Sequence, residues 1–178
     1  MDDRYLAVIG MTTILWGQVD RIMDDCLTFV YNLDETTFKN LFSGKMVGPK
    51  NESLKAGVNR ISGEEAKKAI VKMCDAISKC LADRNTMTHG VWGWHWHEKE
   101  QVYEPCSRSI AKNRLFFLRD LPDLYERVNE AAVLADRAFA YLAGLERHDL
   151  RNRISIYAEN FGKPGNPPLV GPPPRYER

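Results

Sequence analysis

The spacing of apolar residues predicts a chain built mainly from helices. Over residues 2–32, apolar side chains recur mostly at three- and four-residue steps, the spacing that places them on one face of a helix. Residues 63–89 and residues 120–147 follow the same pattern and predict two further long helices. Residues 34–42 and 50–60 predict shorter helices between them.

Several residues mark where these helices are expected to begin and end. Asp34 is expected to cap the second helix, and Ser62, followed three residues later by a glutamate, predicts a capping box. Gly90 is placed to end the next helix as a left-handed C-cap. The last helix is expected to start at a capping Asp120, with Pro122 in its first turn.

The periodicity changes after Gly90 to that of a strand. Trp92, Trp94 and Trp96 alternate with small or polar residues, and residues 101–103 predict a partner strand after a turn. The expected fold is therefore all-α, a bundle of four to five helices with a small tryptophan-rich β-hairpin inserted. The three indoles could stack RNA bases, or they could pack at the end of the bundle or at a dimer interface; packing is the preferred interpretation.

Length and charge predict one domain without a large electrostatic footprint. The chain has 178 residues and a net charge of +1, so we expect no extended contact with duplex DNA. Residues 1–162 are expected to form a single helical domain. Residues 163–178 are rich in proline and glycine and are expected to be extended or disordered.

Cysteine usage and hydropathy point to a cytoplasmic protein. The four cysteines form no CxxC pair and are expected to be buried free thiols. No secretory signal pattern is present, and no apolar run approaches the ~18 residues of a membrane span. His95 and His97 could share a metal with Cys106, but an isolated His-x-His lacks the further ligands of a closed site, so neither a metal nor another cofactor is expected.

The end of the helix that precedes Gly90 carries the candidate chemistry. Arg84 follows Ile70 and Ile77 at seven-residue steps, so a guanidinium continues an apolar row. Such a placement is costly unless the arginine is paired or lines a cleft. Asn85 and His89 are four residues apart and are therefore neighbours on the helix surface.

These three residues suit chemistry on a phosphodiester. Arg84 could hold a phosphate through two parallel hydrogen bonds, and Asn85 could orient a phosphate oxygen or a hydroxyl. His89, at the negative end of the helix dipole, could act as general acid or base. RNA carries its own 2′-hydroxyl nucleophile, so cleavage by transesterification needs no metal. The alternative is an ion-paired arginine, a solvated asparagine and a histidine that only caps the helix.

The run Arg84-Asn85-Thr86-Met87-Thr88-His89, followed by Gly90, resembles the Arg-polar-x-x-x-His signature of the HEPN families. The resemblance implies a bundle of four or five helices, and many members form homodimers in which two motifs face one cleft. Many members are metal-independent ribonucleases. Carried over, Arg84 and His89 would be catalytic and Asn85 would assist them.

The resemblance also implies an acidic residue on the first long helix near the site. Asp20 is the candidate, and Asp24, one turn later on the same predicted helix, is an equally good structural candidate. Thr88 lies close to the row of Arg84 and is a supporting candidate.

The resulting functional expectation is a metal-independent endoribonuclease that acts on RNA, in a toxin or phage-defence role. Its expected partners are RNA, a second copy with the motif at the interface, and a cognate antitoxin. Two alternatives remain open. The first is a non-catalytic HEPN-like module for binding RNA or a nucleotide, or for dimeric assembly, which the near-neutral charge favours. The second is a structural helical protein without a site.

Overall fold

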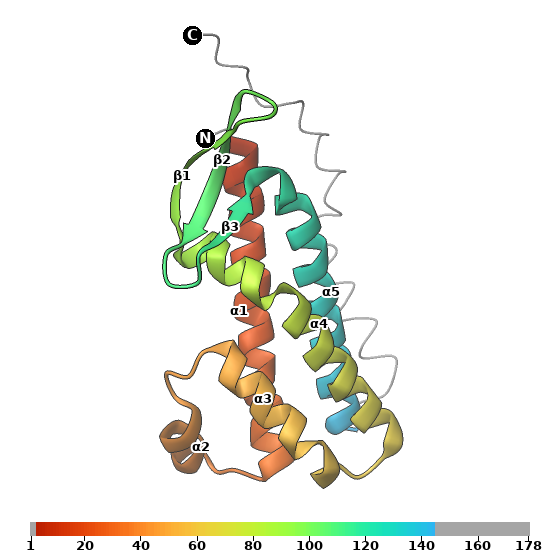
Figure 1. Cartoon of the computed structure of the whole chain (residues 1–178). Coiled ribbons are helices and arrows are strands. Elements are labelled where there is room, and N and C mark those ends of the chain that lie inside the picture. Colours follow the sequence, from red (N-terminus) through yellow and green to blue (C-terminus); the bar gives the residue numbers. More distant parts are fainter. Residues whose placement is uncertain (1–2, 145–178) are drawn as a thin grey trace.

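Within residues 3–144, the part that the computed structural model describes, the chain forms five α-helices and one small sheet (Figure 1). The helices are α1 (Asp3–Tyr31), α2 (Glu35–Phe42), α3 (Val47–Gly57), α4 (Glu64–His89) and α5 (Leu121–Leu142). Short 3₁₀ turns cover Val58–Arg60 and Leu118–Asp120. The strands are β1 (Val91–His97), β2 (Val102–Ser109) and β3 (Arg114–Phe117).

The core lies among the three long helices. Helix α5 packs against both α1 and α4, and its buried face is rich in alanine. Ala131, Ala135 and Ala138 are fully buried, and such small side chains let neighbouring helices approach closely. Helix α3 packs against α1 and α4 at the end of the molecule opposite the sheet (Figure 1).

The sheet is antiparallel in the order β1-β2-β3 and is joined to the end of α4. Trp92 lies opposite Ser107, and Ser107 lies opposite Phe116, which is buried in the core. The Ser107 hydroxyl donates a hydrogen bond to the Thr86 carbonyl oxygen over 2.5 Å. The indole N–H of Trp92 donates to the Met87 carbonyl oxygen over 3.1 Å. The sheet is thus fixed to the turn of α4 that carries the motif.

The expected helices and hairpin are present, and several boundaries are confirmed. The Asp34 side chain accepts a hydrogen bond from the Thr37 backbone N–H over 2.9 Å, as a capping residue does. Asp120 is the N-cap of α5 with Pro122 in the first turn, although the Asp120 side chain makes no capping hydrogen bond. All four cysteines are buried free thiols. Burial raises the pKa of Cys74 to about 12, so this thiol stays protonated at neutral pH.

Two predictions about the ends of α4 are wrong. Ser62 does not cap α4, because the helix begins at Glu64 with Gly63 as the N-cap and no side-chain capping bond. Gly90 is extended rather than left-handed, with φ −79° and ψ 165°, because the chain enters β1 directly. The predicted hairpin is formed by β1 and β2, and β3, a strand of four residues that the pattern did not predict, pairs with β2.

The remaining predictions for the C-terminal region lie outside the described residues. They are the domain boundary at residue 162 and the extended tail. The prediction that the last helix runs to about residue 147 is wrong, because α5 ends at Leu142 and Gly144 follows it with φ +64°. Within residues 3–144, no helix is both long and apolar enough to cross a membrane.

Candidate functional site

The structure brings Arg84, Asn85 and His89 together at the end of α4. Arg84 Nη1 donates a hydrogen bond to Asn85 Oδ1 over 3.1 Å. The same nitrogen lies 3.3 Å from His89 Nε2. The guanidinium carbon of Arg84 lies 5.2 Å from the ring centre of Trp16, which is buried on α1. The contact with Trp16 holds the guanidinium between the two helices, beside an exposed imidazole.

The charge of Arg84 is not matched by a nearby carboxylate. None of the ion pairs formed among residues 3–144 includes Arg84, and its buried Nε atom has no hydrogen-bond partner there. Burial lowers the pKa of the Arg84 guanidinium, and the charge of Asp20 partly opposes this effect. Arginine nevertheless stays protonated in proteins. The site therefore offers a half-buried cation with unused hydrogen-bond donors.

Asp83, the residue before Arg84, forms ion pairs with arginines of two other elements. Its carboxylate lies 2.5 Å from Arg114 Nη2 on β3 and 3.0 Å from Arg127 Nη2 on α5. Burial alone would raise the pKa of Asp83, but the hydrogen bonds from the two arginines outweigh burial and lower it. Because Asp83 is already paired with two other arginines, it does not neutralise Arg84. This network also fixes the end of α4 to the sheet and to α5.

Both acidic candidates on α1 contact one lysine that the sequence did not single out. Lys50 is only 4% exposed, and its Nζ lies 2.8 Å from Asp20 Oδ1 and 2.6 Å from Asp24 Oδ1. Burial raises the pKa of Asp24, and Lys50 only partly reverses that effect. Burial alone would lower the pKa of Lys50, but its bonds to the two carboxylates raise it overall. Two carboxylates therefore share the one ammonium group of Lys50.

The charge of Asp20 therefore acts on the Arg84 guanidinium, but the hydrogen-bond partner of Asp20 is Lys50. A lysine that follows Gly48-Pro49 reads as a solvated turn residue, so no sequence signal identified it. We call Arg84, Asn85 and His89 the Arg84 cluster. Thr88 is exposed, and none of the hydrogen bonds among the described residues joins it to this cluster. Thr86 is buried, and its hydroxyl donates to the Ala82 carbonyl oxygen over 3.0 Å.

The three tryptophans of β1 have different surroundings. Trp92 is half-buried against the core, which agrees with the preferred packing role. Trp96 packs on Tyr103, its cross-strand partner, with 4.8 Å between ring centres. Trp94 is 55% exposed and is the indole of the three with the most surface open to a ligand or partner.

The histidines of β1 belong to a different cluster. His97 Nε2 lies 2.9 Å from Glu104 Oε2, and Arg119 Nη1 lies 3.1 Å from the same oxygen. His95 packs edge-on against His97, with 5.0 Å between ring centres. In residues 3–144, no group of three histidine, cysteine, aspartate or glutamate residues is arranged to hold a metal ion. Another histidine of the sequence, His148, lies outside the described part.

Comparison with family models, curated proteins and solved structures found no match to this chain. The resemblance to HEPN domains therefore stays an interpretation of the motif and of the helical layout. The function has to be argued from the geometry around Arg84.

Proposed function

We propose that this protein is a metal-independent endoribonuclease that cleaves RNA by 2′-hydroxyl transesterification. One observation carries the proposal: the half-buried Arg84 guanidinium has no carboxylate partner among the described residues and lies 3.3 Å from His89 Nε2. A buried cation without a counter-ion costs free energy in the absence of a ligand. An anion that binds there recovers that cost, and a phosphodiester places its reacting atoms within reach of the imidazole.

In the proposed reaction, Arg84 holds the non-bridging oxygens of the scissile phosphate and stabilises the charge of the pentavalent transition state. His89 accepts the proton of the 2′-hydroxyl, or donates a proton to the departing 5′-oxygen. The bond from the 2′-oxygen to phosphorus forms while the bond from phosphorus to the 5′-oxygen breaks. The products are a 2′,3′-cyclic phosphate and a 5′-hydroxyl. Asn85, bonded to Arg84, helps to orient the guanidinium.

We assign Asp20 a supporting role in this scheme. Its bond to Lys50 keeps the carboxylate close enough to influence Arg84 without occupying the guanidinium. A free carboxylate at that place would compete with the phosphate for the same donors. Lys50 thereby acts as a positioning residue for Asp20.

A homodimer is part of the proposal. Leu6 and Ile14, both 51% exposed, lie on the same helix as Trp16, which contacts Arg84. A second copy that covers the exposed side of α1 would bury this apolar surface. The arrangement in which two motifs face one cleft rests on the resemblance alone, because Ile14 and Trp16 lie on nearly opposite sides of the helix. A toxin or phage-defence role with a cognate antitoxin stays an expectation from the resemblance.

The second candidate is a non-catalytic module that binds RNA or a nucleotide, or that assembles as a dimer. It is favoured by the net charge of +1, which is low for a protein that must hold a long polyanion. In that case the same Arg84 cluster would bind a phosphate without cleaving it.

The deciding experiment is cleavage of a mixed pool of tRNA and single-stranded RNA in excess EDTA. Parent protein is expected to leave 2′,3′-cyclic phosphate ends. His89→Ala and Arg84→Ala are each expected to be slower by about 10²–10³-fold. Arg137→Ala, an exposed arginine on α5, is the matched control and should cleave like the parent. Equal rates for all four proteins would refute the assignment, and binding without cleavage by the parent would favour the second candidate.

A further inference from the structure

An open hollow lies on the sheet immediately beyond the motif. It occupies the face opposite to the one on which Ser107 and Phe116 pack toward the helices, because side chains alternate between the two faces of a strand. Its volume of about 710 Å³ falls within the range of small-ligand sites. We call it the Gly93 hollow, and the residues that matter for its chemistry are Val91, Gly93, His95, Arg108, Ile110 and Asn113.

The residues that line the Gly93 hollow are mainly apolar, and the hollow is open to solvent. A side chain built at Gly93 would meet nothing within 4 Å, so the absence of a side chain there leaves free space above the strand. Val91 is 60% exposed and Ile110 is 78% exposed, although both are large apolar residues. A flat apolar ring that enters the hollow would cover both of them.

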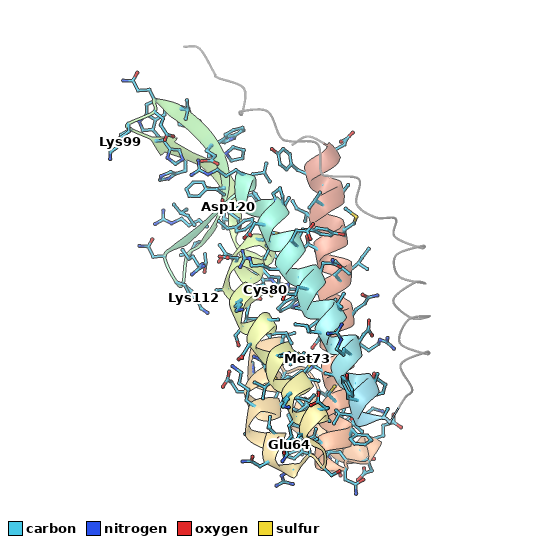
Figure 2. All side chains as sticks on the ribbon, turned by 90° about the vertical axis from the view of Figure 1, so that its right-hand side faces the viewer. Glu64, Met73, Cys80, Lys99, Lys112 and Asp120 are labelled. Carbon is cyan, nitrogen blue, oxygen red and sulfur yellow. The ribbon has the colours of Figure 1, made fainter. Side chains whose placement is uncertain are left out.

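The rim is cationic and rich in hydrogen-bond donors. Arg108 Nη2 donates to Asn113 Oδ1 over 2.8 Å, which leaves the other guanidinium N–H groups and the Asn113 amide N–H groups available. None of the residues that line the hollow carries a carboxylate. Exposed Lys112 lies in the turn between β2 and β3, away from the helices (Figure 2). A ligand with an apolar face, acceptor atoms on its edge and negative charge nearby matches this rim.

The hollow lies at a short, fixed distance from His89. Val91 is two residues further along the chain, so the two Cα atoms are at most about 7 Å apart. Arg108 is the cross-strand partner of Val91, which places the cationic rim at the same end of the sheet. Gly90, which lies between His89 and Val91 in the chain, packs against the Thr86 carbonyl oxygen and the Ser107 hydroxyl.

We propose that the Gly93 hollow binds one unpaired base of the RNA strand whose phosphate lies at Arg84 and His89, with guanine preferred. The inference rests on the proposed function and adds a substrate preference to it. Guanine fits because its O6 and N7 are both acceptors on one edge, the arrangement that an arginine can bond with two N–H groups. Adenine places a donor next to N7 and would face the donors of Arg108 and Asn113 with a mismatch.

Binding to a strand that cannot be cleaved tests the hollow separately from catalysis. The probe is a fluorescently labelled trinucleotide with 2′-O-methyl riboses, which lack the nucleophilic hydroxyl, with guanine or adenine at the centre. Fluorescence anisotropy with the full chain is expected to give binding at least fivefold tighter for the guanine probe. Gly93→Leu, which places a branched side chain in the hollow, is expected to weaken binding of that probe about tenfold. Ala56→Leu, an exposed alanine on α3, is the matched control and should bind like the parent.

Circular dichroism first establishes that each variant is folded. If Gly93→Leu does not fold, Arg108→Gln replaces it and is expected to abolish the preference for guanine. Parent binding without base preference, or Gly93→Leu binding equal to the parent, overturns the hollow as a base site.

The matching all-ribose trinucleotide separates the two proposals. Cleavage that is equally fast for both bases and unaffected by Gly93→Leu overturns the hollow but leaves the ribonuclease standing. Selective binding of the guanine probe without any cleavage supports the hollow and counts against the ribonuclease.

Discussion

Arg84 Nη1 and His89 Nε2 lie 3.3 Å apart, although both belong to basic side chains. A guanidinium nitrogen can only donate, so a hydrogen bond between them requires the lone pair of His89 Nε2. The imidazole is then neutral, with its proton on Nδ1. In that state the ring can accept a proton from a hydroxyl that displaces the guanidinium from Nε2. An anion bound between the two groups would also allow both to be charged together.

Replacing the unpaired arginine by an apolar residue should stabilise the protein. We expect Arg84→Met to raise the free energy of unfolding by about 0.5–1.5 kcal/mol, because it removes a half-buried cation that has no carboxylate partner among the described residues. Urea denaturation followed by circular dichroism measures the change, and the RNA cleavage assay should show activity lost. Arg127→Met is the control: Arg127 pairs with Asp83 and Asp123, so its loss should destabilise. If both variants lose stability equally, Arg84 is a structural arginine.

Removing the charge of Asp83 should weaken the attachment of the sheet and α5 to α4. We expect Asp83→Asn to cost about 1–2 kcal/mol at pH 7, most of it through Arg127, because Arg114 is 47% exposed and its bond is screened by solvent. Glu35→Gln, in a solvent-exposed pair with Lys39, should have no measurable effect.

The same variant should reveal a pH dependence of defined sign. The folded pKa of Asp83 lies below its ordinary value of 3.8, so the carboxylate stabilises the fold above that pH. The contribution is lost as pH falls through the folded pKa. Urea titrations at several pH values should therefore show parent and Asp83→Asn converging below about pH 4. A difference that stays constant down to pH 2 would contradict the ion-pair explanation.

A methyl group at Gly90 should be costly, whereas one at Gly93 should not. A Cβ at Gly90 would overlap the Thr86 carbonyl oxygen and the Ser107 hydroxyl, and it would lie 3.0 Å from the Arg108 carbonyl carbon. We expect Gly90→Ala to lower the free energy of unfolding by roughly 1–3 kcal/mol, as overpacking does. Gly93→Ala has open space around it and should be neutral or slightly stabilising. Thermal denaturation of the pair tests this contrast, and equal midpoints would mean that the chain around Gly90 relaxes freely.

A charge on the exposed face of α1 should separate the proposed dimer. Ile14 is 51% exposed, and Ile14→Glu would place a carboxylate in the interface if a second copy covers this face. Sedimentation velocity is expected to find parent protein as a dimer and the variant as a monomer. Met46→Glu, at a methionine that is 69% exposed and precedes α3, is the control and should stay dimeric. Parent protein that sediments as a monomer would remove the dimer from the proposal.

The helices were predictable because each long one carries its own periodic apolar face. Local capping was predictable at Asp34, whose side chain bonds its own helix, but not at Ser62, because α4 begins at Glu64 with Gly63 as its N-cap. It was not predictable at Gly90, where a tertiary contact decides the backbone: the glycine is needed for close approach to β2, and the extended conformation follows from the start of β1. Strand β3 escaped prediction because four residues are too few to set a period.

The candidate site was predictable only where its residues are neighbours on one helix. Spacing alone places Asn85 beside His89, because residues four apart lie on one helix surface. Arg84 is five residues from His89, and only the structure shows its guanidinium within reach of both side chains. The tertiary contacts were not visible: Trp16 beneath the guanidinium comes from α1 and Lys50 comes from α3. Nothing local distinguishes a lysine that becomes buried between two carboxylates from one that stays in water.

The tight packing of Gly90 fixes the distance from His89 to Val91 as well as the backbone conformation of the glycine. Because Gly90 is tightly packed, the segment from His89 to Val91 cannot lengthen or shorten. The distance between the place where a phosphate would react and the place where a base would be held is therefore constant. An RNA strand engaged at both would be cut a constant number of nucleotides from the recognised base, whatever the sequence around it. Mapping the 5′ ends of the fragments should then give one fixed offset instead of a scatter of neighbouring cuts.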